Sequence, residues 1–297
     1  MDDVKLAVIG GSGAYALLKR KALVGEEVPA RETPFGPSQP MARVEAEGTS
    51  FLFLSRHGQR RYSIAAPFVN YRANIYALKD LGVEHIISWS GPGTMNQKFL
   101  LAQFVVIEDV IDETRNRKGT FYENNGLGFI RQNPVFCPTL RAALVETLKE
   151  LNWQFVAGGT YVCTEGPRLE TPAEIRKMKA YGGDLVGMTL CPEAFLAREL
   201  EMCYAAVCYV SNYAEGIRER DYRAGELFEG LLTRDEMEKV EESVAKFPGI
   251  MQNVARRLKA TEFKCNCRKA MERYRLRGDI GTNWREWLKP SSSAQNI

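Results

Sequence analysis

Several common signals of protein function are absent from this chain of 297 residues. It has no run of about 18 apolar residues, so we expect no membrane-spanning helix and no membrane partner. Residues 1–5 carry neither a basic segment nor a long apolar one, so they do not predict a signal peptide. The net charge of only +3 gives no indication that the chain binds nucleic acid.

Histidine is scarce as well, since the chain has only two, His57 and His85. The seven cysteines are an odd number for a disulfide framework, and they predict reduced thiols and a cytoplasmic location. Cys265 and Cys267 are too closely spaced and too isolated along the chain for a zinc site. We therefore expect no metal.

Apolar runs alternate with helical patterns along most of the chain, whose composition is 45% hydrophobic and 26% charged. The pattern predicts strands at residues 6–9, 51–55, 85–89, 104–107, 160–163, 185–188 and 204–211. It predicts helices at residues 71–81, 139–151, 172–181, 192–202 and 233–257. Such alternation indicates an α/β fold, with a central mixed β-sheet flanked by helices in a single domain that spans residues 1–258.

Loops and a C-terminal extension complete this organisation. Residues 29–40 and 116–134 are rich in Pro, Gly, Asn and charge, and we expect loops there. Thr171, Pro172 and Glu174 predict a helix start with a capping box. Residues 259–277 are basic and indicate a surface helix or a subunit-contact helix, followed by a polar, mobile tail at 290–297. Residues 259–297 therefore form a predicted helical extension.

A glycine loop at residues 10–13 directly follows the first predicted strand. Such a loop brings backbone N–H groups close to an anion, so it predicts a phosphate or a phosphorylated ligand. From Gly11 the loop also fits a loose dinucleotide-binding pattern, with glutamates at 26–27 at a suitable distance. The polar stretch from residue 19 leaves little room for the second strand of that motif. No Gly-Lys-Ser/Thr follows, which excludes a P-loop.

Arg56 and His57 follow the second predicted strand. An arginine offers a planar fork of donors that suits phosphate oxygens, and a histidine can donate from one ring nitrogen. A surface ion pair and a satisfied strand-end histidine are the alternatives. Because open α/β sheets bind ligands at the carboxyl ends of their strands, the glycine loop favours an anion site here.

Ordered motifs continue along the chain: Gly-Gly-Ser-Gly at 10–13, Arg-His-Gly at 56–58, Val-Asn-Tyr-Arg-Ala-Asn at 69–74, Glu-Gly-Pro-Arg at 165–168, Gly-Met-Thr at 187–189 with Pro-Glu at 192–193, and Ser-Asn-Tyr at 211–213. In these motifs residues 4–258 resemble the trimeric purine nucleoside phosphorylases, in particular the branch that contains methylthioadenosine phosphorylase. The resemblance implies that inorganic phosphate cleaves the N-glycosidic bond of a purine nucleoside. The products would be a free base and ribose 1-phosphate, or a 5-modified version of that sugar. It implies a homotrimer in which a neighbour completes each site, and no metal or organic cofactor.

The same resemblance implies roles for individual residues. The phosphate-binding residues would be Ser12, Arg56, His57, Ser90 and Thr189. The residues that bind the nucleoside would be Gly91, Leu169, Glu170, Met188, Ser211 and Asn212, with Met188 against the ribose and the last two facing the base. The catalytic residues would be Ser12, His57 and Asn212.

Asn212 is the position that indicates which purine is bound. Its amide offers a donor and an acceptor, which suit O6 and N7 of a 6-oxopurine. Relatives that take 6-aminopurines carry aspartates here and two residues later, where this chain has Ala214. Glu170 aligns with a glutamate that accepts from N1–H in relatives acting on inosine and guanosine, although it could also serve only the helix cap. The sequence therefore favours inosine, guanosine or 5′-methylthioinosine.

The chain departs from the family pattern in places. Residues 62–68 lack the usual additional histidines, Trp89 and Pro92 alter a small turn, residues 95–100 replace a charged segment, and Leu169 stands where an aromatic often stacks on the base. These departures are compatible with an altered substrate, slow turnover or a lost activity. A 5′-methylthioadenosine phosphorylase, a nucleoside-binding paralogue without catalysis and a nicotinamide-dependent oxidoreductase therefore stay open as alternatives.

Overall fold

The computed structural model describes residues 5–11, 13, 17, 25–46, 48–58, 62–226 and 231–289. Ser12, which the sequence places in the phosphate site, and the tail at 290–297 lie outside the described residues. Among the helices that are described, none combines the length and the apolar character that crossing a bilayer requires.

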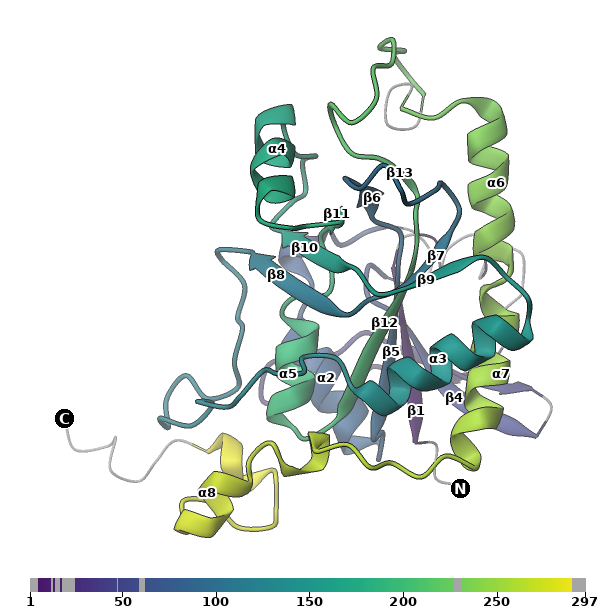
Figure 1. Cartoon of the computed structure of the whole chain (residues 1–297). Coiled ribbons are helices and arrows are strands. Elements are labelled where there is room, and N and C mark those ends of the chain that lie inside the picture. Colours follow the sequence, from purple (N-terminus) through teal and green to yellow (C-terminus); the bar gives the residue numbers. More distant parts are fainter. Residues whose placement is uncertain are drawn as a thin grey trace.

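Two mixed sheets form the centre of the protein (Figure 1). The first has eight strands in the order β2 (Glu26–Val28), β3 (Met41–Ala46), β4 (Thr49–Ser55), β1 (Leu6–Gly10), β5 (His85–Ser90), β12 (Cys203–Tyr209), β7 (Phe104–Val106) and β9 (Phe155–Ala157). The second has five, in the order β13 (Asn212–Tyr213), β6 (Gly93–Thr94), β11 (Leu185–Gly187), β10 (Thr160–Thr164) and β8 (Asp109–Glu113). The predicted mixed α/β fold is confirmed, but it contains a second sheet that the sequence did not predict.

Two of the strands that sequence reasoning missed share a charged composition. The segments Glu26–Val28 and Asp109–Glu113 read EEV and DVIDE, and most of their residues are exposed or half-buried. Such short, charged strands lack the apolar run by which a buried strand is recognised. β6 and β9 were missed because they are only two and three residues long.

Four chain segments pass directly from the first sheet into the second. β5 leads into β6 through residues 91–92, β7 into β8 through 107–108, β9 into β10 through 158–159, and β12 into β13 through 210–211. The carboxyl ends of the central strands β5 and β12 therefore meet the second sheet. This junction holds Ser90, Ser211 and Asn212, all of which are buried.

Helices cover both faces of the first sheet (Figure 1). α2 (Tyr71–Asp80) and α5 (Glu193–Glu199) pack on one face, and α3 (Pro138–Glu150) and α7 (Phe247–Lys259) on the other. Alternate residues of β1 point to opposite cores, Ala7 and Ile9 to the first and Leu6 and Val8 to the second. The sheet is consequently buried on both sides.

The predicted helices are present, with one correction. The expected helix at 233–257 is two helices, α6 (Arg234–Ala245) and α7, because Pro248 lies in the first turn of α7 and has no N–H to continue the ladder of α6. α4 (Pro172–Ala180) begins with the predicted capping box between Thr171 and Glu174. Residues 29–40 and 116–134 are irregular, as expected.

The predicted helical C-terminal extension is present, but its helices are short. Helical structure between residues 259 and 289 is limited to α8 (Glu272–Arg277) and short 3-10 turns. Met271, Tyr274 and Trp287 are buried in the core on the side of α2 and α5. The extension is therefore held by apolar burial, which a reading of its charges alone did not detect. The domain boundary at residue 258 stays a prediction.

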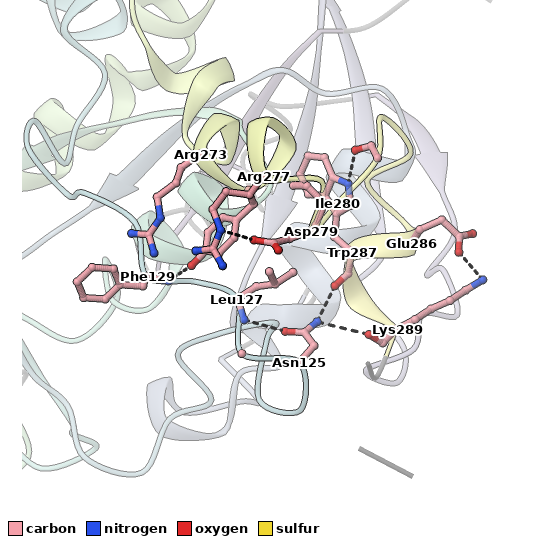
Figure 2. A pocket seen from close by; sticks show the side chains of 13 residues that line it. Asn125, Leu127, Phe129, Arg273, Arg277, Asp279, Ile280, Glu286, Trp287 and Lys289 are labelled. Carbon is pink, nitrogen blue, oxygen red and sulfur yellow. Dashed lines mark hydrogen bonds and ion pairs between the residues drawn. The ribbon is translucent and has the colours of Figure 1, made fainter. Parts of the chain in front are cut away.

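A hollow of about 630 Å³ separates part of this extension from the loop at 116–134 (Figure 2). Its sides are joined by Asn125 Nδ2, which donates to the carbonyl of Trp287 at 2.6 Å, and by the N–H of Phe129, which donates to the hydroxyl of Tyr274 at 2.9 Å. None of the predicted site residues lines this hollow. The candidate active site therefore lies elsewhere, at the junction of the two sheets.

Candidate active site

A cavity of about 670 Å³ lies at the junction of the two sheets. Nine of the residues predicted from the sequence line it: His57, Ser90, Gly91, Leu169, Glu170, Met188, Thr189, Ser211 and Asn212. Gly11 and Gly13, on either side of Ser12, also line it. The structure thus brings together residues that are separated by up to two hundred positions in the sequence.

Two hydroxyl groups that line the cavity, those of Ser90 and Thr189, lie beside a third that is buried behind them. Ser90 Oγ lies 3.0 Å from Thr189 Oγ1, and the hydroxyl of Tyr161 lies 3.5 Å from each of these atoms. Tyr161 was not predicted, although it belongs to the predicted strand at 160–163. Burial raises its pKa above the ordinary value, so its hydroxyl keeps its proton at neutral pH. The cluster offers neutral donors suited to the oxygens of an anion.

Tyr209 lines the cavity, and sequence reasoning missed it. A Cβ at either Gly13 or Gly91 would overlap its hydroxyl group. Only glycine at these two positions lets the backbone pass this close to the Tyr209 hydroxyl. The absence of a Cβ also leaves room for a ligand. A tyrosine two residues before Ser211, in a strand that ends at the site, was the only signal available in the sequence.

His57 faces the cavity as a neutral ring. Its Nδ1 lies 2.8 Å from the carbonyl oxygen of Ile64, which can only accept, so Nδ1 carries the hydrogen and Nε2 is left as an acceptor. Burial, together with the charge of Arg56, lowers the pKa of His57 to about 4. Tyr62 stacks on the ring with a centroid separation of 4.6 Å. The prediction that this ring donates to a ligand is corrected, because the carbonyl already uses its donor.

Arg56 has contacts different from those predicted. It is fully buried, does not line the cavity, and forms an ion pair with Glu193, from Nε at 2.7 Å and from Nη2 at 2.9 Å. Burial alone would lower the pKa of Arg56, but the Glu193 carboxylate raises it above the ordinary value. The fork that was expected to hold phosphate is thus taken by a carboxylate. Only Nη1 lies against the cavity wall, 3.2 Å from where a Cβ of Gly11 would stand.

Asn212 and Ser211 are tied to the turn between β5 and β6. Ser211 Oγ is placed to donate to the carbonyls of Gly91 and Pro92, at 2.9 and 3.1 Å, and to Asn212 Oδ1 at 2.7 Å. Asn212 Nδ2 donates to the carbonyl of Tyr213 at 2.9 Å. The hydroxyl of Ser211 is therefore used inside the protein and not on a base. One amide hydrogen and one oxygen lone pair of Asn212 remain for a ligand.

The other predicted substrate residues also line the cavity. Glu170 accepts from the hydroxyl of Thr164 at 2.5 Å, and burial raises the pKa of its carboxyl. The side chain of Met188 packs closely against Gly166, and Leu169 is 40% exposed at the rim. These three residues supply an acceptor and apolar surface to the cavity.

Arg117 holds the loops around the cavity and was hidden in the predicted loop at 116–134. Its Nη1 donates to the carbonyls of Met188 and Cys191, at 2.7 and 2.6 Å. Its Nη2 donates to the carbonyls of Thr164 and Glu165, at 3.1 and 2.7 Å. One buried cation thus fixes the ends of β10 and β11. Most of its partners are backbone oxygens, the hydroxyl of Tyr71 at 3.0 Å being an exception, and no sequence pattern marks such an arginine.

Two mixed sheets with a cavity of this kind at their junction define an α/β enzyme that acts on a small molecule. Residues 5–256 match the family model described as the Phosphorylase superfamily, and the chain belongs to this family. The predicted family is therefore confirmed.

Relatives and solved structures agree with this assignment. The chain is 40% identical to a 6-oxopurine nucleoside phosphorylase from Pyrococcus furiosus, over 90% of this chain and 98% of the relative. It is 37% identical to a probable S-methyl-5′-thioinosine phosphorylase from Thermodesulfovibrio yellowstonii, over 91% of this chain and 97% of the relative. A methylthioadenosine phosphorylase structure from an antarctic soil metagenomic library is similar with a TM-score of 0.81 and 27% identity, over 98% of this chain and all of the other.

The buried ion pair generates a stability prediction. Glu193→Ala leaves the guanidinium of Arg56 buried without a counter-charge, so we expect the free energy of unfolding to fall by about 3–5 kcal/mol, measured by urea unfolding. The control Glu146→Ala removes an exposed ion pair with Lys149 and should cost less than about 1 kcal/mol. Equal losses in the two variants would contradict the importance of the pair.

The neutral state of His57 generates a pH prediction. Its pKa falls from 6.5 to about 4 on folding, so the unfolded chain binds the proton first as pH is lowered. This group therefore makes the free energy of unfolding decrease between pH 6.5 and 4, by up to about 1.4 kcal/mol per pH unit. Imidazole ¹⁵N shifts, assigned with His57→Gln, should show a neutral ring throughout pH 5.5–8. A midpoint near 6.5 would refute the assignment of an acceptor.

Proposed function

We propose that this chain catalyses the phosphorolysis of purine nucleosides and prefers those with a 6-oxopurine base. The products are the free purine and ribose 1-phosphate or its 5-modified form. The observation that carries the proposal is the single cavity that places the Ser90–Thr189 hydroxyl pair and the amide of Asn212 on the same ligand space. Family membership supports the reaction class, and the named relatives include 6-oxopurine nucleoside phosphorylases.

Phosphate is held by neutral donors in this proposal. The hydroxyls of Ser90 and Thr189 bind its oxygens, Nε2 of His57 accepts from a protonated oxygen, and Ser12 keeps its predicted role. The described lining residues include neither lysine nor arginine. Among the described residues, Arg56 lies behind Gly11, and Glu193 offsets its positive charge. Such a site positions the dianion without quenching its attack on the anomeric carbon, where oxocarbenium character develops.

The leaving purine is stabilised at its other edge. The free hydrogen of Asn212 Nδ2 donates to O6, and Oδ1 accepts from N7 as that nitrogen becomes protonated. Glu170 accepts from N1–H, which requires its carboxylate form. Because burial raises the pKa of Glu170, base binding should weaken as pH falls earlier than for an ordinary glutamate.

The cavity also has an apolar side. Leu231, Leu232 and Val240 are among its lining residues. Apolar side chains favour an apolar 5′ substituent over a hydroxyl. The proposed substrates therefore include 5′-methylthioinosine together with inosine and guanosine.

A homotrimer in the cytoplasm is part of the proposal. Phe68 is 76% exposed, and Ala66, two residues before it, lines the cavity. A large exposed aromatic two residues from a lining residue supports a subunit contact that completes the site. Sedimentation analysis of the purified protein tests the trimer directly.

The reaction is tested by incubating the purified protein with inosine, guanosine or 5′-methylthioadenosine, with and without inorganic phosphate. We expect hypoxanthine and guanine to appear only with phosphate, each matched by an equal amount of ribose 1-phosphate, as measured by chromatography. Release of base from 5′-methylthioadenosine alone would overturn the 6-oxopurine preference. Binding without phosphate-dependent turnover would indicate a paralogue without catalysis, and a thermal shift with NAD would indicate an oxidoreductase.

Asn212→Asp tests the recognition of the base. A carboxylate cannot donate to O6, so we expect kcat/KM for inosine to fall roughly 10- to 100-fold. The control Asn283→Asp makes the same change at an exposed position and should leave the rate unaltered. An unchanged rate for Asn212→Asp would show that the amide does not contact the base.

A further inference from the structure

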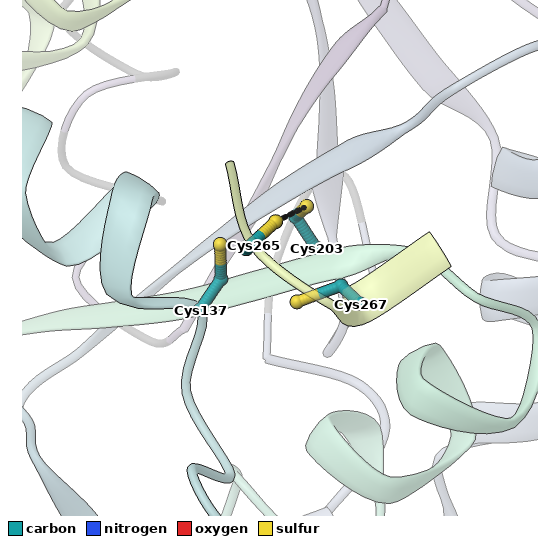
Figure 3. A group of neighbouring side chains, drawn as sticks. All are labelled: Cys137, Cys203, Cys265 and Cys267. Carbon is teal, nitrogen blue, oxygen red and sulfur yellow. Dashed lines mark hydrogen bonds between the residues drawn. The ribbon is translucent and has the colours of Figure 1, made fainter. Parts of the chain in front are cut away.

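Four cysteine thiols lie together at the end of the first sheet opposite the cavity (Figure 3). The sulfur atoms of Cys137, Cys203, Cys265 and Cys267 are all within 4.8 Å of one another. Cys137 directly precedes α3, Cys203 opens β12, and the other two belong to the segment after α7. The sequence prediction of no metal rested on Cys265 and Cys267 alone, because their partners lie far away along the chain.

We propose that this cluster is a structural zinc site. A tetrahedral zinc ion with Zn–S bonds of about 2.3 Å places its four sulfurs about 3.8 Å apart. Cys203 Sγ and Cys265 Sγ are 3.5 Å apart, and all four cysteines are free thiols. Only sulfur ligands converge here, which favours zinc over magnesium or calcium.

The burial of the ligands indicates a closed site. Cys137, Cys203 and Cys267 are buried and Cys265 is half-buried, which leaves no coordination position for a substrate or water. On binding, the four thiols release four protons and the Zn²⁺ thiolate centre carries a net charge of −2. The site therefore serves the fold and not the reaction.

Arg198 provides a second, independent observation. It is buried, its Nη1 lies 3.6 Å from Cys267 Sγ, and its Nε has no partner. Within the part of the chain that the structure describes, the other hydrogen bond of its guanidinium goes to a backbone carbonyl, that of Arg131. A buried guanidinium without a carboxylate requires another negative charge nearby. Thiolates on a metal supply that charge and accept its hydrogen bond strongly, whereas neutral thiols carry no charge and accept only weakly.

The proposed ion would join three parts of the molecule. It connects the start of α3 and the start of β12 with the C-terminal extension at 265–267. The sheet and the extension are then crosslinked at a point where the extension has left α7 and has not yet reached the core residue Met271. Metal binding would hold the extension on the sheet.

The test is the zinc content of the purified protein, expressed with zinc and dialysed without chelator. We expect about one zinc ion per chain, and X-ray absorption should show four sulfur neighbours at about 2.3 Å. Cys265→Ser combined with Cys267→Ser should lose at least nine-tenths of the zinc. The control Cys208→Ala removes a buried cysteine outside the cluster and should retain it.

A second measurement tests for the zinc site even if the cysteine variants fail to fold. Replacing zinc with cobalt in the unaltered protein should give the sulfur-to-cobalt charge-transfer bands of a tetrahedral thiolate centre. Absence of zinc and of these bands would overturn the proposal, whether mass spectrometry then finds four free thiols or two disulfides. Because neither measurement involves a nucleoside, failure here is distinct from failure of the proposed phosphorolysis.

Discussion

The ion pair between Arg56 and Glu193 lies at the centre of this structure. The pair is fully removed from water, and its desolvation is offset only because almost every donor of Arg56 has an acceptor. The guanidinium also contacts the hydroxyl of Ser88 at 2.8 Å, and the hydroxyl of Tyr204 donates to Glu193 at 2.9 Å. The pair thereby joins β4, β5, β12 and α5 beneath the cavity floor. The geometry of the proposed phosphate site depends on it.

This arrangement also sets the electrostatics of the cavity. The carboxylate of Glu193 opens α5, so the positive end of that helix and the charge of Arg56 are both largely offset before any ligand arrives. His57 is neutral for a related reason, since burial beside a cation disfavours a second positive charge. The ligand space is consequently polar without being strongly charged, which suits a reaction that needs an anion held in place but still reactive.

The sequence predicted the long buried strands and most of the residues that line the cavity. It failed where the role of a residue depends on its neighbours in space. The strands β1 and β12 can be recognised in the sequence, because a strand buried on two faces must be an apolar run. The strand β8 is charged, and it was not recognised. Motif order placed Thr189 and Asn212 on one cavity, because ordered motifs preserve position. It could not reveal that Glu193 occupies the fork of Arg56, since that contact spans 137 residues and uses an ordinary acid.

The path of the C-terminal extension has a consequence for how the chain is made. Arg268 pairs with Glu84 across 184 positions, and Trp287 completes a core that β1 and α2 begin. During synthesis the early strands therefore leave the ribosome long before the residues that cover them. Contacts between residues so far apart in the sequence form slowly, and until they form the nascent sheet lacks part of its cover. Until translation passes Trp287, this face of the sheet lacks side chains that bury it, and exposed apolar surface of this kind favours aggregation.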